Sequence, residues 1–290
     1  MRKSARLREL VRPGATLVMP DAYDALSARL IERLGFQAVQ CSGFSIALAA
    51  CCQQEASLGL EENLRVTRHI VEAVSVPVMA DGEDGFGDAS QVGQTVRRYI
   101  ELGTAGMNIE DQVLGLAGGA KQVIDRQAMV DKIVAARSAA VSAGDAGFFL
   151  NSRTDALVAA QDRAAGLKEA IERANRYLQA GGDLAFIIGV NTVEEARTLV
   201  AEIAGPVSIA AGTPSNMGLS IAELRQCGVA RLSLPTLAVF ASLQAMTQVL
   251  SGVQAGEGFA AMAERGLLAS MKTVGELLSQ DPPKPERNAK

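Results

Sequence analysis

The sequence of 290 residues is poor in the residue types that build metal-thiolate sites and aromatic cores. It contains no Trp, one His and four Cys. The cysteines have no spacing typical of a zinc site, so we expect reduced, buried thiols and no zinc chemistry. Aromatic residues make up 4% of the chain and hydrophobic residues 48%. The core must therefore consist mainly of Ala, Val, Leu and Ile, a composition typical of a globular protein.

The sequence also lacks runs of positive charge and long apolar stretches. Its formal net charge is −4, and neither half carries the basic segment with which nucleic-acid-binding proteins contact phosphates. No segment offers the roughly 18 uninterrupted apolar residues of a membrane span, and "MRKSARLRELVRPG" at the start lacks the apolar core of a signal peptide. We expect a cytoplasmic protein that binds neither nucleic acid nor membranes.

The chain does contain a regular alternation of short apolar runs with longer amphipathic segments. The first pair is "TLVMPDAY" followed by "DALSARLIERLG", and the eighth is "RLSLP" followed by "TLAVFASLQAMTQVLSG". Eight such strand–helix units without a linker predict an α/β fold, a closed (β/α)₈ barrel of the TIM type. A doubly wound sheet is the alternative, although no G-x-G-x-x-G follows the first strand, which disfavours a dinucleotide-binding dehydrogenase.

One more helical segment follows the eighth unit. Residues 256–278, "GEGFAAMAERGLLASMKTVGELL", carry an apolar stripe that requires a partner, and another subunit would supply one. We expect residues 1–280 to form a single barrel domain with this extra C-terminal helix. The polar residues 281–290 are expected to form a disordered tail.

Charged and hydroxyl side chains gather where the first five strands end. In a barrel of this type the loops that follow the strands meet at one face, and chemistry collects there. The ends of strands six to eight, near "IIGV", "AAGT" and "SLPT", are almost uncharged. We therefore predict a site over strands one to five, formed from Asp21, Ser42, Gly43, Phe44, Asp81, Glu83, Glu110, Asp111, Arg153 and Asp155.

The third strand leads into the acidic stretch "MADGEDGFGD", residues 79–88. Asp81 and Glu83 are two positions apart, which places both on one side of an extended strand end. With Glu110 from the next strand, they form a carboxylate set that suits a hard cation, and water in the remaining positions favours Mg²⁺ over Ca²⁺. Asp84 and Asp88 are expected to serve a turn and a helix cap. The alternative is an acidic turn without a metal.

Two further features of this face suit an anionic substrate. The guanidinium of Arg153 is a planar cation that matches a carboxylate or a phosphonate. A salt bridge to Asp155 or another acid is the alternative for Arg153, and the two roles are compatible. Ser42 and Gly43 offer a hydroxyl and backbone amides to an oxyanion. For Gly43 the alternative is close packing at a strand end.

Four motifs on successive strand ends, "CSGF", "ADGEDGFGD", "GMNIEDQ" and "NSRTDA", together resemble the signature set of the isocitrate lyase and phosphoenolpyruvate mutase superfamily. The resemblance covers about residues 15–250. It implies a (β/α)₈ barrel, commonly a homotetramer whose final helix is exchanged between subunits. It also implies an enzyme, dependent on Mg²⁺ or alternatively Mn²⁺, that makes or breaks a bond at C3 of a pyruvate-like fragment.

The resemblance also assigns roles to individual residues of the face. Asp81 would be the direct metal ligand, with Glu83 and Glu110 acting mostly through bound water and Glu55, in "CQQEASLGL", as a further acidic position. The carboxylate or enolate oxygen of a small 2-oxo or 2-hydroxy acid would bind at Ser42, Gly43 and Phe44. Its carboxylate would also bind Arg153.

The chain departs from the family pattern in its candidate bases. The segment 113–124, "VLGLAGGAKQVI", has neither the Lys-Lys/Arg-Cys-Gly-His loop of the lyases nor the Pro-Lys-x-Asn-Ser loop of the mutases. Strand six carries Ile187 and Ile188 in place of a glutamate, and Gln40 replaces an aromatic residue. These losses favour a reaction without a strong protein base. Lys121 is the remaining candidate base, with a solvated surface lysine as the alternative.

We therefore predict a Mg²⁺-dependent lyase that cleaves a C–C bond of a small 2-oxo or 2-hydroxy dicarboxylate, for example by decarboxylating oxaloacetate or cleaving a methylisocitrate-like acid. One alternative is a phosphonate P–C bond enzyme of the mutase or hydrolase kind. The other is a non-catalytic barrel that binds a metabolite.

Overall fold

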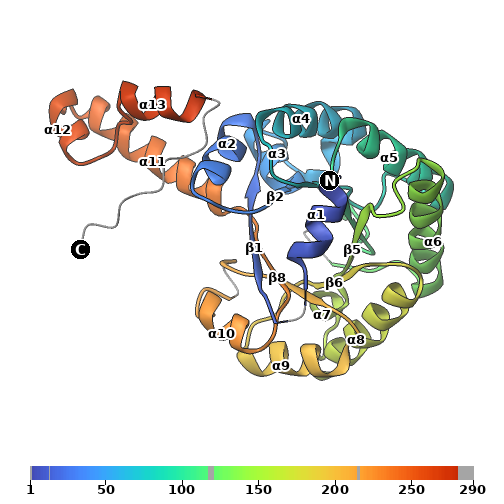
Figure 1. Cartoon of the computed structure of the whole chain (residues 1–290). Coiled ribbons are helices and arrows are strands. Elements are labelled where there is room, and N and C mark those ends of the chain that lie inside the picture. The colour runs from blue at the N-terminus through green and yellow to red at the C-terminus, as the bar shows by residue number, and fades with distance from the viewer. Residues whose placement is uncertain (1, 13, 117–120, 214–215, 280–290) are drawn as a thin grey trace.

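The computed structural model describes residues 2–12, 14–116, 121–213 and 216–279. Eight parallel strands form a closed barrel in which each strand pairs with the next and the eighth pairs with the first (Figure 1). The predicted (β/α)₈ barrel is confirmed. The strands are β1 (Leu17–Ala22), β2 (Val39–Cys41), β3 (Val78–Asp81), β4 (Gly106–Glu110), β5 (Phe149–Thr154), β6 (Leu184–Ile187), β7 (Val207–Ala210) and β8 (Arg231–Leu234).

A ring of helices surrounds the barrel because each strand is buried on both faces. In β4, Met107 and Ile109 pack outward against the helices, whereas Asn108 contacts Asn151 of β5 and Glu110 contacts Arg153 of β5. Side-chain alternation along a strand thus separates the packing residues from the residues that reach the site. The helices of the ring are α2 (Ala25–Arg33), α4 (Gly59–Ala73), α5 (Ala89–Leu102), α6 (Arg126–Ser142), α8 (Arg163–Gln179), α9 (Val193–Glu202) and α10 (Ile221–Gln226).

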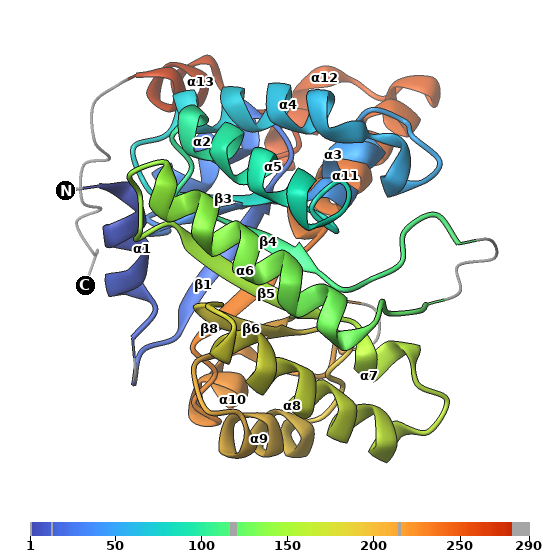
Figure 2. The ribbon, with the colours of Figure 1, turned by 90° about the vertical axis from the view of Figure 1, so that its right-hand side faces the viewer.

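A short helix that the sequence pattern did not predict, α1 (Lys3–Leu10), closes one end of the barrel. Leu7 is fully buried and belongs to a core cluster with Leu17, Phe149 and Leu184, the first residues of their strands. Figure 2 shows α1 at one end of the barrel and the segment that follows β4 at the other. The open face is therefore the carboxyl end of the strands.

The last helices extend away from the barrel as an arm (Figure 1). The arm comprises α11 (Leu237–Gln254), α12 (Phe259–Glu264) and α13 (Met271–Leu278). The single helix expected over 256–278 is therefore wrong, because residues 265–270 interrupt it. Among the described residues, no helix is long and apolar enough to cross a membrane. The tail predicted for 281–290 lies outside the described residues.

Candidate active site

Three carboxylates converge at the carboxyl end of β3. One oxygen each from Glu55, Asp81 and Glu83 lies within 4.8 Å of the others. Asp81 ends β3, and Glu55 begins the 3₁₀ turn η1 (Glu55–Ser57). Glu83 has a φ of 47°, so the predicted convergence of Asp81 and Glu83 arises from a left-handed residue and not from an extended strand end.

The carboxylate cluster has the properties of a cation site. Oδ1 of Asp81 and both carboxylate oxygens of Glu83 are buried without a hydrogen-bond partner among the described residues. Burial, followed by the charge of Asp81, raises the pKa of Glu55 to about 7 and that of Glu83 well above its ordinary value. Buried carboxylates this close favour protonation unless a cation neutralises them. The all-oxygen donor set therefore fits a hard divalent ion such as Mg²⁺.

Two glycines allow the cluster to form. A Cβ atom at Gly43 would lie 1.7 Å from Oε1 of Glu83, and one at Gly82 would lie 2.5 Å from the carbonyl oxygen of Asn108. The Gly82 N–H donates to that same carbonyl at 3.1 Å, and the Glu110 N–H donates to the carbonyl of Glu83 at 2.9 Å. The acidic loop therefore continues the pairing of β3 with β4 past the end of the strand.

Asp81 is held in place from two sides. The Gly43 N–H donates to Asp81 Oδ2 at 2.9 Å, so in this structure the amide assigned to substrate binds the carboxylate. Behind the strand, Asn63 of α4 and Tyr99 of α5 donate to the carbonyl of Asp81 at 3.1 and 3.0 Å. Neither Asn63 nor Tyr99 was predicted from the sequence to support the cluster. The sign in the sequence that could have identified them is a polar group on a helix face that is otherwise buried.

Ser42 and Phe44 begin the short helix α3 (Gly43–Ala49) next to the cluster. Ser42 is its N-cap and accepts from the Ser45 N–H at 3.2 Å. The Phe44 ring is 43% exposed and meets Phe240 of α11 edge-on, with ring centroids 6.4 Å apart. Phe44 also lines a cavity of about 430 Å³ with Glu55, Lys121 and residues 112–116.

Arg153 of β5 lies between two carboxylates. Its Nη1 is 2.5 Å from Oε2 of Glu110, and its Nε and Nη2 donate to the two oxygens of Asp155 at 2.7 and 3.0 Å. The predicted salt bridges of Arg153 therefore exist. Burial raises the pKa of Glu110, and the charge of Arg153 opposes that rise. Of the four carboxylates assigned to metal, three converge, and Glu110 contacts Arg153 instead.

Lys121 lies at the mouth of the site and is not a free surface lysine. Its Nζ contacts Oε1 of Gln112 and lies 3.8 Å from Oδ2 of Asp155. The side chain is 43% exposed. Lys121 thus adds a second positive charge near Arg153.

The barrel interior below the cluster holds a buried cation that the sequence analysis missed. Arg231 of β8 is fully buried, donates to Gln40 Oε1 at 2.6 Å and to Ser208 Oγ at 3.0 Å, and stacks over the ring of Phe186. Gln40, which departs from the family pattern, is therefore the hydrogen-bond acceptor for Arg231. Burial of Asp21 at the end of β1 raises its pKa, and the charge of Arg231 opposes that rise.

The expectation of buried thiols holds only in part. Cys41 is buried, and burial raises the pKa of its thiol, whereas Cys51 is exposed and has a φ of 55°. The loop that leads from α3 to Glu55 carries Cys51 to the surface.

This geometry agrees with comparisons to known proteins. The family model described as phosphoenolpyruvate phosphomutase matches residues 7–254. The chain belongs to this family. The resemblance that the four motifs indicated is confirmed, because the family lies within the isocitrate lyase and phosphoenolpyruvate mutase superfamily.

Relatives of the family include both lyases and phosphonate enzymes. The 2,3-dimethylmalate lyase of Eubacterium barkeri is 32% identical over 282 residues, which are 95% of this chain and 93% of the relative. The 2-methylisocitrate lyase of Aeropyrum pernix is 32% identical over 84% of this chain and 77% of its own. A crystal structure of phosphonopyruvate hydrolase with oxalate and Mg²⁺ aligns with a TM-score of 0.83 and 26% identity, covering 96% and 95% of the two chains.

Proposed function

We propose that this protein is a Mg²⁺-dependent lyase that cleaves a C–C bond of a small 2-oxo or 2-hydroxy dicarboxylate. The observation that carries the proposal is the cluster of Glu55, Asp81 and Glu83 at the open end of the barrel, with Arg153 close by. The two lyases named above, each 32% identical to this chain, support C–C chemistry. The solved hydrolase complex with Mg²⁺ supports the choice of metal, and Mn²⁺ is the alternative.

Different residues of the site would bind the metal and the substrate. Asp81, Glu83 and Glu55 would hold Mg²⁺ directly or through water, and Glu110 would act through its ion pair with Arg153. The bound ion would supply the positive charge that stabilises an enolate. Arg153, oriented by Glu110 and Asp155, would bind the substrate carboxylate through its planar fork. The Ser42 hydroxyl and the Phe44 amide would meet the neighbouring oxygen, and Gly43, whose N–H donates to Asp81, would hold that carboxylate beside them.

The proposed reaction suits a site that is poor in bases. Decarboxylation of a 3-carboxy-2-oxo acid releases CO₂ and leaves the bonding electron pair on C3 of a pyruvate enolate, which then takes a proton. In cleavage of a 2-hydroxy acid the C2 hydroxyl becomes the carbonyl of the 2-oxo acid product, and the electron pair stays on the carbon next to the carboxylate of the other product, which takes the proton. Decarboxylation of a 3-carboxy-2-oxo acid needs no prior proton removal. Cleavage of a 2-hydroxy acid also requires a base for the hydroxyl, and Lys121, near Asp155, is the candidate for that role.

A phosphonate P–C bond enzyme is the second candidate. The likeness to phosphonopyruvate hydrolase favours it, and Arg153 would bind a phosphonate as well as a carboxylate. A barrel that binds a metabolite without turnover is the third. Ligand-dependent stabilisation without any product would distinguish it from both enzymes.

Turnover assays separate these candidates. We would follow oxaloacetate, 2,3-dimethylmalate, methylisocitrate, isocitrate and phosphonopyruvate by NMR, with Mg²⁺ and with EDTA. Metal-dependent cleavage of a carbon acid is expected, and D81A and R153A should each lower it by about 10³-fold or more. Arg163→Ala, which removes an ion pair to Glu195 on the outer helices, is the matched control. Full activity in D81A or R153A would contradict the site assignment.

The assembly belongs to the same proposal. The arm exposes several large apolar side chains, among them Phe240, Leu243 and Leu250. A soluble chain rarely leaves so large an apolar face uncovered. We therefore propose a homotetramer in which subunits exchange this arm, in a cytoplasmic enzyme.

A further inference from the structure

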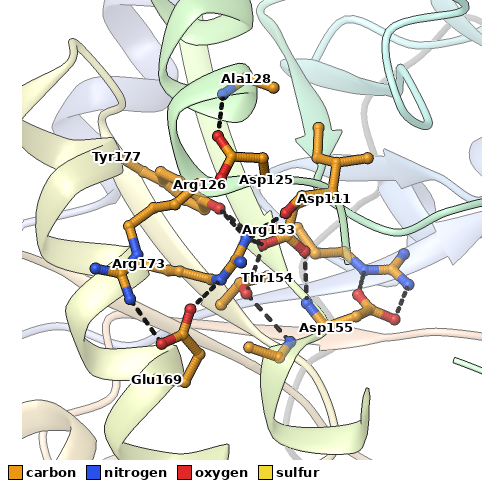
Figure 3. A network of polar contacts seen from close by, with 12 residues as sticks. Asp111, Asp125, Arg126, Ala128, Arg153, Thr154, Asp155, Glu169, Arg173 and Tyr177 are labelled. Carbon is orange, nitrogen blue, oxygen red and sulfur yellow. Dashed lines mark hydrogen bonds and ion pairs between the residues drawn. The ribbon is translucent and has the colours of Figure 1, made fainter. Parts of the chain in front are cut away.

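Asp111 follows Glu110 in the sequence, but its carboxylate lies on the opposite side of the strand. It is fully buried between the barrel and α8 and does not reach the open face (Figure 3). We infer that Asp111 is a positioning residue that sets the orientation of Arg153 without touching the substrate. The inference deepens the proposed function, because it names a group on which substrate binding by Arg153 depends.

The carboxylate of Asp111 is saturated with hydrogen bonds. Its Oδ1 accepts from the backbone N–H of Asp155 at 3.0 Å. Its Oδ2 accepts from the Thr154 hydroxyl at 2.8 Å, the Tyr177 hydroxyl at 2.8 Å and the Arg173 guanidinium at 3.1 Å. Four donors on a buried carboxylate define its position closely, because each would lose a partner if it moved.

The hydrogen bonds to β5 connect Asp111 to Arg153. Asp111 accepts hydrogen bonds from both residues that follow Arg153: from the Thr154 hydroxyl and from the Asp155 backbone N–H. The two carboxylate oxygens of Asp155 in turn accept from Nε and Nη2 of Arg153. The Asp111 N–H also donates to the carbonyl of Arg153 at 3.3 Å. The orientation of the guanidinium therefore depends on where Asp111 holds the end of β5.

Asp111 also holds the chain where it returns from the loop after β4. Its carbonyl accepts from the Ile124 N–H at 2.8 Å, and Arg173 donates to the Ile124 carbonyl at 2.9 Å. Arg173, which neutralises Asp111, therefore also holds the Ile124 backbone next to Asp111. Arg173 is itself held by Glu169, which accepts from its Nε at 2.7 Å.

This network supports Arg153 and does not itself contact the substrate. Asp111 and Tyr177 are buried behind the strands, so neither can contact a substrate above the barrel. A cluster needed only for stability would not have to hold the backbone of the residue whose carboxylate binds Arg153. Side chains that orient a binding group in this way contribute through geometry.

The test compares D111N with a matched variant, D183N. Asp183 is also a largely buried aspartate that bonds two arginines, Arg137 and Arg8, and the backbone N–H of Leu150, but it lies at the other end of β5. Two readouts are measured: the Nε–H resonance of Arg153 by ¹H–¹⁵N NMR, assigned with R153K, and oxalate affinity by calorimetry in Mg²⁺.

We expect D111N to shift the Arg153 resonance, speed its exchange with water and weaken oxalate binding by about tenfold. D183N should lower the melting temperature without either effect. In the R153K background, D111N should weaken oxalate binding no further, because Asp111 acts through Arg153. If D111N does not fold, T154V removes one donor to Asp111 and should show a smaller shift in the same direction.

An unchanged Arg153 resonance in D111N, or in T154V if that variant replaces it, would overturn the inference. So would equal losses of oxalate affinity in D111N and D183N. If the wild-type protein does not bind oxalate at all, the proposed function fails, and the Arg153 resonance still decides the role of Asp111.

Discussion

The roles of the four acids in residues 81–88 differ although the residues are close in sequence. Asp81 and Glu83 converge on Glu55, whereas Asp84 accepts from the Phe86 N–H at 2.9 Å and serves a turn, as predicted. The difference arises from the left-handed backbone at Glu83, which turns its carboxylate back to the barrel. Sequence spacing indicated which acids belong together, but the backbone conformation determined how they meet.

The raised pKa of Glu55 predicts how stability changes with pH in the metal-free protein. Its folded pKa of about 7 lies above the ordinary value of 4.5, so the folded state binds more protons between these values. The free energy of unfolding should therefore fall as pH rises from 4.5 through 7, by up to about 3 kcal/mol.

Urea unfolding at several pH values in EDTA tests this expectation. In E55Q, whose side chain cannot ionise, the free energy of unfolding should decrease much less over this pH range. Saturating Mg²⁺ should also reduce this decrease, because the cation favours the ionised carboxylates. Parallel pH curves for wild type and E55Q would show that Glu55 does not titrate in this range.

At the scale of elements, the same acidic stretch begins helix α5. Asp88 is its N-cap and accepts from the N–H groups of Ser90 and Gln91 at 2.9 and 3.0 Å. The predicted cap is confirmed. One loop therefore combines part of the candidate site with a helix start, since the turn that directs Glu83 towards the carboxylate cluster also leads the chain into α5.

D88A should lower the free energy of unfolding by about 1 kcal/mol, the usual cost of losing an N-cap. Turnover and Mg²⁺ affinity should stay unchanged, because Asp88 lies outside the carboxylate cluster. Urea unfolding and Mg²⁺ calorimetry measure the two quantities, with S90A on the same turn as the control. A large loss of Mg²⁺ affinity in D88A would place Asp88 in the site.

At the scale of the whole molecule, the arm and the barrel differ in how they are buried. The barrel strands are buried on both faces, whereas α11 buries only Val239 among its 18 residues. An 18-residue helix this apolar is stable only when most of its surface is covered. That contrast supports exchange of the arm between subunits, which stays a prediction.

Sedimentation equilibrium should give about four times the chain mass of 30.3 kDa. The double variant L243K/L250K should dissociate the assembly. Both leucines are exposed on α11 of the single chain, and if the assembly covers them, each lysine would place an unpaired charge in the interface. Q248K on the same helix is the matched control and should keep the wild-type mass. A monomer in the wild-type protein would contradict the proposed assembly.

The sequence by itself determined the barrel and the family, and it predicted most members of the candidate site. Repeated strand–helix units allow few folds, and polar residues at strand ends must meet at one face. Tertiary structure decided what depends on contacts between distant segments: the pairing of Glu110 with Arg153, the hydrogen bond from Arg231 to Gln40, and the position of Asp111 behind the strand. Neighbouring residues of a strand face opposite sides, and only the packed neighbours show which side chains reach the open end of the barrel and which are buried against the helices.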